Sequence, residues 1–238
     1  MRNIFSMDSK FMQMLNLVAD YVLFNLLFLV TALLPVVVLF LLLFLGVNVP
    51  QFAYLPCLAV SVVLVGPAKT ALYRVMFDMT EDRGNPYKRY FKTYFGELRT
   101  VVPLCLLKDG VTLFLFWEFT VVLGANQMPL QKVVLVALGA IGLLWAVVFS
   151  TLFPQVAVFP STRKEYLHDC LYITLSRFLR CLLTALMDVL PLALFLLNMN
   201  LFSLLLPVFG FFYFTVTTNL CVRLWQKPFD KYIESAEA

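Results

Sequence analysis

Long uncharged segments alternate with short charged ones along the chain. The first long segment contains no charged residue from Tyr21 to Ala68. It is too long for a single helix, because about 20 residues already cross a hydrocarbon core roughly 30 Å thick. The polar stretch Gly46–Gln51 in its middle is typical of a turn. We therefore predict two antiparallel membrane-spanning helices in this region.

The same pattern over the whole chain predicts an all-α fold, a polytopic transmembrane helical bundle of six spans. Residues 125–129 and 198–200 provide the other two short turns. The spans pair into out-and-back segments, so three helical hairpins within one membrane domain, residues 1–238, is an architecture that fits. The predicted spans cover residues 15–45, 52–77, 98–124, 133–159, 181–197 and 201–224, and cytoplasmic amphipathic loops cover residues 78–97 and 161–180.

The composition supports this interpretation and excludes others. Hydrophobic residues make up 62% of the chain and charged residues 13%, with a mean hydropathy of +0.89. Soluble domains contain roughly 25% charged residues, and a small one has too little interior to bury so much apolar surface. A soluble enzyme, a disordered chain and a disulfide-stapled secreted domain are therefore excluded. The five cysteines form no C-x-x-C pair and are expected to be reduced apolar residues.

The distribution of positive charge predicts an orientation. Six spans place both termini on one side of the membrane. Of the 18 Lys and Arg residues, 16 fall on that side, Lys132 falls on the other, and Lys108 lies within the third span. The positive-inside rule then places both termini and both long loops in the cytoplasm. The net charge of +4 is thus explained by topology, and no nucleic-acid partner is expected.

The two cytoplasmic loops combine aromatic or apolar residues with Lys and Arg at helical spacing. Such helices lie in the headgroup plane, where rings insert and positive charges meet anionic lipid. A second interpretation is a docking site for a cytoplasmic partner. The candidate lipid or partner contacts are Tyr87, Lys88, Tyr90, Phe91, Lys92 and Arg177.

Motifs for catalysis and metal binding are lacking. Glu165-x-x-His168 contains the only histidine, and a carboxylate di-metal site would need a second such arm and more carboxylates. There is no G-x-S-x-G and no phosphate-binding loop. We therefore expect no metal, no cofactor and no enzymatic activity, with an enzyme acting on lipid-linked sugars as the third-ranked alternative.

Polar residues inside the predicted spans are the candidate chemistry. A charge at bilayer depth costs at least about 2.5 kcal/mol on insertion scales, so it faces the protein interior or water. One interpretation is that ion pairs and hydrogen bonds lock the bundle, and the other is a solute or proton path. The candidate intramembrane polar site comprises Asp20, Asn25, Lys108, Asp109, Glu118 and Asp188.

The second span contains a proline next to a glycine. Pro67 removes a backbone donor inside the helix, and Gly66 allows a neighbouring element to come close. A kink is therefore expected at Gly66 and Pro67, with Lys69 just beyond it toward the cytoplasm.

Several of these motifs resemble a known family. Asp20-x4-Asn25, Pro35, Gly66-Pro67-Ala68-x-Thr70-Ala71-Leu72-Tyr73 and the aromatic stretch Tyr90–Phe95 are similar to the N-terminal signature of the YesL family, although the apolar run between Pro35 and Gly66 is longer here. That family consists of bacterial integral membrane proteins of unknown function, often associated with carbohydrate utilisation and ABC-type sugar importers. The resemblance implies a bacterial cytoplasmic membrane and supplies no catalytic residues.

Two functions follow as expectations. The first is a non-enzymatic accessory or regulatory component of carbohydrate uptake, in contact with the lipid bilayer, with subunits of an ABC-type sugar importer and with further copies of itself. The alternative is a secondary transporter of a small polar solute. The E-A-A…G loop of ABC permeases is absent, which disfavours a permease subunit but not a secondary transporter.

Overall fold

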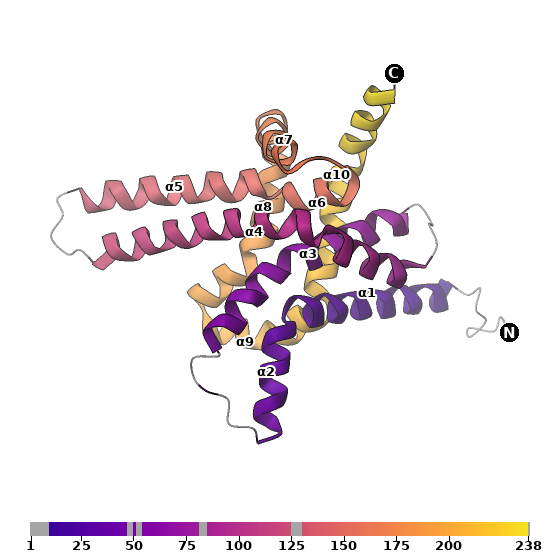
Figure 1. Cartoon of the computed structure of the whole chain (residues 1–238), viewed down its shortest axis with the longest axis horizontal. Coiled ribbons are helices and arrows are strands. Elements are labelled where there is room, and N and C mark those ends of the chain that lie inside the picture. The colour runs from indigo at the N-terminus through magenta and orange to yellow at the C-terminus, as the bar shows by residue number, and fades with distance from the viewer. Residues whose placement is uncertain (1–9, 47–49, 51–53, 81–84, 125–129, 238) are drawn as a thin grey trace.

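The computed structural model describes residues 10–46, 50, 54–80, 85–124 and 130–237, and these residues form helices with no strand among them (Figure 1). Most of the predicted turn at residues 46–51, the turn at residues 125–129 and residues 81–84 of the first loop lie outside this part of the chain. The elements are α1 (Lys10–Ala32), α2 (Leu34–Phe44), α3 (Tyr54–Thr80), α4 (Pro86–Gly124), α5 (Gln131–Phe149), α6 (Leu152–Val158), α7 (Arg163–Ser176), α8 (Phe178–Leu197), α9 (Met199–Val208), the π-helix η2 (Phe209–Tyr213) and α10 (Phe214–Glu237).

The predicted fold class, an all-α transmembrane bundle, is confirmed. Within the described residues, five helical segments are long and apolar enough to cross a membrane. Helices α7 and α8 pass the same test together but are bent by 111° at Arg177, which gives up to six spans. The five segments are Met14–Ala32, Ala59–Met79, Pro86–Gly124, Gln131–Val158 and Met199–Asp230.

Helix α3 lies at the centre of the bundle. It contacts α1, α2, α4, α6 and α10, and the α4–α5 hairpin extends from it to one side (Figure 1). Its second half contributes the small residues Ala68 and Ala71 together with Leu72 and Val75, all fully buried. Small side chains let helices approach closely in a membrane, where lipid provides no hydrophobic drive for association. The core therefore forms around this half of α3.

The first predicted span is divided into two helices. Helix α1 ends at Ala32 and α2 begins at Leu34, and the two lie at a steep angle in Figure 1. Pro35 has no N–H, so the carbonyl of Thr31 four residues earlier loses its helical donor. The Tyr94 hydroxyl donates to that carbonyl at 3.3 Å, and the Tyr90 hydroxyl lies 2.7 Å from the Thr31 hydroxyl. Two tyrosines of α4 thus stabilise the break.

Three other prolines inside helices are compensated in the same way. Pro103 frees the carbonyl of Arg99, which accepts from Arg163 at 2.6 Å. Pro228 frees the carbonyl of Leu224, which accepts from Arg180 at 3.2 Å. Pro191 frees the carbonyl of Met187, which accepts from the Tyr213 hydroxyl. In each case a side chain from another helix replaces the missing donor, so each proline marks a cross-link between helices.

Helix α4 joins the first predicted loop to the third predicted span. Its 39 residues, at about 1.5 Å each, reach roughly 58 Å, well beyond a 30 Å hydrocarbon core. Residues 86–97 are therefore the first turns of this long helix and not a separate surface helix.

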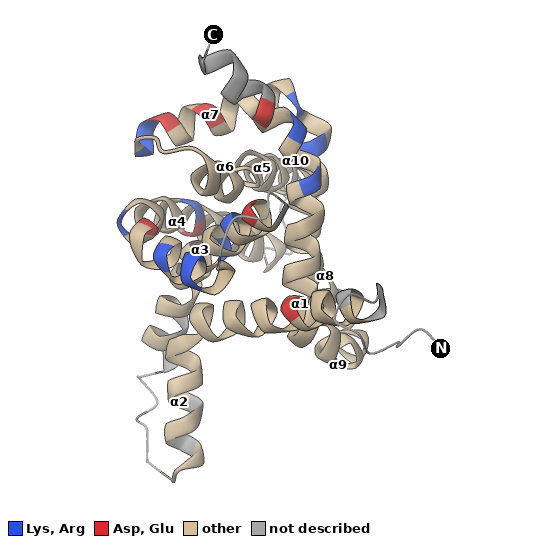
Figure 2. Cartoon of the chain, turned by 90° about the vertical axis from the view of Figure 1, so that its right-hand side faces the viewer, with Lys and Arg blue, Asp and Glu red and all other residues tan. Residues whose placement is uncertain are grey.

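Charged residues are unevenly distributed. On the face shown in Figure 2 they gather over α3, α4, α7 and α10, whereas α2 and α9 contain no charged residue. Helix α7 begins with a capping box: the backbone of Glu165 donates to the Thr162 hydroxyl, and the Glu165 carboxylate accepts from the Thr162 backbone. This cap defines where the chain leaves α6 and starts its charged surface helix.

Candidate functional site

A cavity of about 280 Å³ lies among α3, α4, α5, α8 and α10. Four charged side chains line it among polar and apolar ones. We refer to it as the polar cavity. Its lining includes Lys69, Lys108, Asp109, Thr112, Trp145, Phe153, Asp188, Tyr213 and Thr217.

The four charges form two ion pairs. Lys69 Nζ lies 2.5 Å from Asp188 Oδ1 and joins α3 to α8. Lys108 Nζ lies 3.0 Å from Oδ1 of its neighbour Asp109 on α4. The side chains are between 16% and 28% exposed, so they are largely shielded while still reaching the cavity. The cavity wall is formally neutral but presents ammonium and carboxylate groups together.

One aromatic ring lies beside both lysines. The ammonium groups of Lys69 and Lys108 lie 5.3 Å and 5.2 Å from the centroid of Phe153, within cation–π range. Phe153 belongs to α6 and is only 3% exposed, so its position is set by packing. The ring therefore holds the two cations near one another without adding charge.

Neutral hydrogen-bonding groups complete the wall. The Trp145 indole donates to the carbonyl of Lys108 at 3.2 Å, and the Tyr213 hydroxyl donates to the carbonyl of Met187 next to Asp188. The hydroxyls of Thr112 and Thr217 each donate at 2.8 Å to the carbonyl four residues earlier in the chain. Each hydroxyl keeps lone pairs that can accept from a bound molecule.

The structure brings together three of the six residues of the candidate polar site. Lys108, Asp109 and Asp188 line the polar cavity, and they are joined there by Lys69, which was predicted only as a residue beside the kink. Glu118 lies nine residues after Asp109 on α4 and does not line the cavity. Asp20 also lies elsewhere, where its carboxylate accepts from the Tyr87 hydroxyl at 3.2 Å.

Asn25 is fully buried and has a different role. Its amide donates to the carbonyls of Phe209 and Gly210 at 3.0 and 2.6 Å, and its carbonyl accepts from the backbone of Thr215 at 3.2 Å. These groups belong to the π-helix and the start of α10. A π-helix leaves backbone groups out of the regular ladder, and Asn25 satisfies them from α1. This residue supports the interpretation that hydrogen bonds lock the bundle.

At Gly66, α3 comes close to α4. A Cβ placed there would lie 2.0 Å from Cys105 Sγ, 3.1 Å from Val101 Cγ1 and 3.3 Å from Phe153 Cε1. The expected close approach at Gly66 is thus present. Helix α3 continues through Pro67 as one helix, and a kink at Gly66 and Pro67 stays a prediction.

The candidate contact residues differ in their exposure. Tyr90 is fully buried against α1 and is not available to a partner. Tyr87, Lys88, Phe91 and Lys92 are exposed, whereas Arg177 is half-buried at the bend between α7 and α8.

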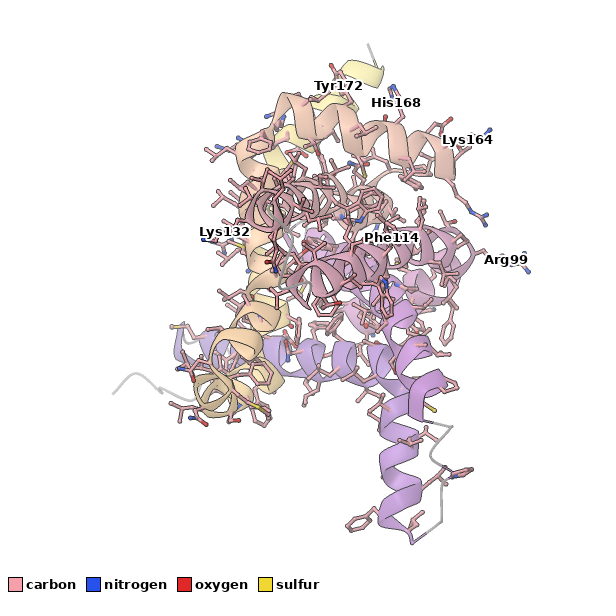
Figure 3. All side chains as sticks on the ribbon, turned by 90° about the vertical axis from the view of Figure 1, so that its left-hand side faces the viewer. Arg99, Phe114, Lys132, Lys164, His168 and Tyr172 are labelled. Atoms are coloured by element: carbon pink, nitrogen blue, oxygen red, sulfur yellow. The ribbon has the colours of Figure 1, made fainter. Side chains whose placement is uncertain are left out.

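Helix α7 presents its polar residues outward. Figure 3 shows His168, Lys164 and Tyr172 pointing away from the body of the molecule. Among the described residues, no group of three His, Cys, Asp or Glu side chains could hold a metal ion. The Glu165-x-x-His168 motif therefore remains a pair of surface residues.

Comparison with known protein families, curated proteins and solved structures finds no match to this chain. The geometry of the polar cavity is therefore the basis for a functional assignment.

Proposed function

We propose that this protein is a membrane transport protein, a secondary transporter whose polar cavity holds a small polar solute during its passage. The observation that carries this proposal is the joint presence of Lys69, Lys108, Asp109 and Asp188 around one cavity. Ionisable groups inside a membrane are costly and mark ion or substrate pathways. An ion pair needed only for rigidity would require neither a cavity nor a second pair beside it.

The size and chemistry of the cavity indicate the class of solute. Its volume of about 280 Å³ lies just below the roughly 300–1,000 Å³ of sites for drug-sized ligands. Ammonium, carboxylate, indole and hydroxyl groups together match a solute with several hydrogen-bonding groups, such as a monosaccharide or a zwitterionic amino acid. A purely apolar or a highly charged solute would leave some of these groups unpaired.

The helices around the cavity contain prolines and a π-helix, at which a helix can bend. Pro191 lies inside α8 near Asp188, and η2 follows Pro207 and contributes Tyr213 to the wall. Broken helices and π-bulges occur at the binding sites of transporters, because non-helical backbone at membrane depth is tolerated where it lines a cavity. Rocking about these points is the proposed route by which the cavity exchanges sides.

The proposed orientation places both termini in the cytoplasm of a bacterial membrane. The distribution of 16 of 18 Lys and Arg residues supports it.

Solute flux into proteoliposomes tests the transport function. Vesicles containing the protein are mixed with a hyperosmotic solution of glucose or of glutamine, and light scattering follows their re-swelling. Wild-type vesicles are expected to re-swell faster than protein-free vesicles for at least one solute. Asp188→Asn is expected to slow this flux about 10–100-fold, the equivalent of one charge-assisted hydrogen bond of about 1.5–3 kcal/mol.

Two controls separate transport from folding. Glu118→Gln removes an acid of α4 that does not line the cavity and should leave flux unchanged. Lys69→Met combined with Asp188→Asn removes both charges of the pair, which relieves the cost of an unpaired charge. Transport through the cavity predicts that this double variant folds and stays inactive. Recovered flux in the double variant, or no flux of either solute in the wild type, would contradict the proposal.

An accessory role in carbohydrate uptake is the second candidate. It is supported by the YesL resemblance and by exposed apolar residues beside positive ones, such as Phe91 and Phe95 on α4, at 41% and 65% exposure. This function predicts that the protein purified in mild detergent carries subunits of an ABC-type sugar importer, and that Phe91→Ser releases them. Purification without such subunits would argue against it.

A further inference from the structure

A second cavity, of about 630 Å³, lies where the second half of α3 meets the start of α4 and the end of α6. It is separate from the polar cavity, and we refer to it as the basic cavity. Its ionisable lining residues are Arg74, Asp78, Arg89, Lys92 and Glu97. Three positive side chains therefore converge on one hollow from two helices.

The two arginines are held in place by a buried acid. Asp78 Oδ2 lies 2.9 Å from Arg89 Nη1 and 3.5 Å from Arg74 Nε, and the Asp78 side chain is only 5% exposed. Arg74 Nη1 also donates to the carbonyl of Ala157 at 2.8 Å. One carboxylate thus fixes two guanidinium groups and neutralises only one of their charges. Both arginines remain about one-third exposed, with side-chain exposures of 37% and 35%.

The third cation is available to a ligand. Lys92 is exposed, lines the basic cavity one turn after Arg89, and has no ion pair within the part of the chain that the structure describes. Thr93 adds a hydroxyl, and Gly96 leaves the wall open, since nothing lies within 4 Å of a Cβ placed there. Glu97 is a second acid beside Asp78, and the two acids against three cations leave the cavity with a formal charge of +1.

From this arrangement we infer that the basic cavity binds the phosphate group of an anionic ligand through Arg74, Arg89 and Lys92. Arginine guanidinium groups match phosphate oxygens in a bidentate geometry, and a positioned lysine adds a point charge. Because Asp78 holds both arginines in advance, little side-chain entropy is lost on binding. The ligand is either the headgroup of an anionic phospholipid at the membrane surface or a soluble phosphate ester, since both offer the same chemistry.

Substitutions that remove one positive or one negative charge test the phosphate site. The detergent-purified full chain is titrated with phosphatidylglycerol, with zwitterionic phosphatidylcholine and with soluble glycerol 3-phosphate, and native mass spectrometry measures the bound fraction. Lys92→Gln is expected to weaken phosphate binding about tenfold, as the loss of one charge-assisted contact implies. Glu97→Gln should tighten it several-fold, because it removes an opposing charge.

Lys88→Gln is the matched control. It makes the same change of charge four residues earlier on α4, at an exposed residue that does not line the cavity, and should leave binding unchanged. Selective binding of phosphatidylglycerol would identify a lipid headgroup as the source, and binding of glycerol 3-phosphate a soluble ester. Equal binding of phosphatidylglycerol and phosphatidylcholine without glycerol 3-phosphate, equal effects of Lys92→Gln and Lys88→Gln, or binding of neither phosphate would overturn the inference.

Discussion

Gly66→Ala is expected to destabilise the protein by about 3 kcal/mol or to prevent its folding. The added Cβ would lie 2.0 Å from Cys105 Sγ, a distance that no packed pair can adopt. Cys105 is 1% exposed, so its sulfur has little room to move, and Val101 and Phe153 close the site on other sides. Overpacking typically costs about 1–3 kcal/mol and occasionally more. Equilibrium unfolding in mixed micelles, followed by helical circular dichroism, measures the change.

Two variants make this prediction specific. Gly66→Ala combined with Cys105→Ala removes the sulfur and should recover most of the lost stability. Gly110→Ala lies on α4 with nothing within 4 Å of its Cβ, and it should be neutral or stabilise by up to about 1 kcal/mol. Equal effects at the two glycines would show that α3 and α4 do not meet at Gly66.

Asn25→Leu is expected to destabilise the bundle by about 3–5 kcal/mol. The change leaves two carbonyls, of Phe209 and Gly210, and the N–H of Thr215 without their side-chain partner. An unsatisfied buried polar group costs about 1–3 kcal/mol. The same mixed-micelle unfolding experiment measures the loss.

The matched change at an exposed position is Asn200→Leu on α9, which should alter stability little. Asn25→Asp is a further variant, because aspartate keeps the acceptor for Thr215 but cannot donate to the two carbonyls when ionised. It should be destabilising as well. A stable Asn25→Leu protein would mean that the π-helix does not depend on α1.

Hydropathy predicted the all-α class because the bilayer requires long apolar helices whatever their tertiary partners are. It could not predict the break between α1 and α2. Pro35 signalled a freed carbonyl, but the tyrosines that stabilise the break come from α4, about 60 residues away in sequence. The prediction also divided the single helix α4 into a loop and a span, because its first turns are polar and its last turns apolar.

The candidate polar site was predicted only in part, because the sequence shows isolated charges but not their distant partners. Asp188, Lys108 and Asp109 stand out as charges in apolar sequence, and the structure gathers them. Lys69 was missed because it follows the Gly66-Pro67 pair at the edge of an apolar run, where a lysine is typical of the cytoplasmic boundary. Its pairing with Asp188 joins residues 119 positions apart, and no local pattern reports such a contact. The lone acid Asp188 was the available signal, since a deep charge requires a partner.

The basic cavity could not be predicted either, because it also depends on contacts between residues far apart in the sequence. Of its three cations only Lys92 was predicted as a lipid or partner contact, and Asp78, which orders the two arginines, appeared only as the start of a polar stretch. Burial of that carboxylate is a tertiary property and turns scattered positive charge into a preorganised group.

Access of water to the polar cavity tests the central claim most directly. Thr112 lines the cavity, whereas its neighbour Leu113 is 66% exposed on the outside of α4 and does not line it. Each is replaced by cysteine in a Cys57→Ala background, and vesicles are treated with a charged maleimide, which reacts with thiolates formed in water. A solute-binding cavity predicts rapid labelling of Thr112→Cys, slowed by the transported solute, and little labelling of Leu113→Cys. Failure to label Thr112→Cys, or equal labelling of both, would contradict this account and leave the ion pairs as a structural lock.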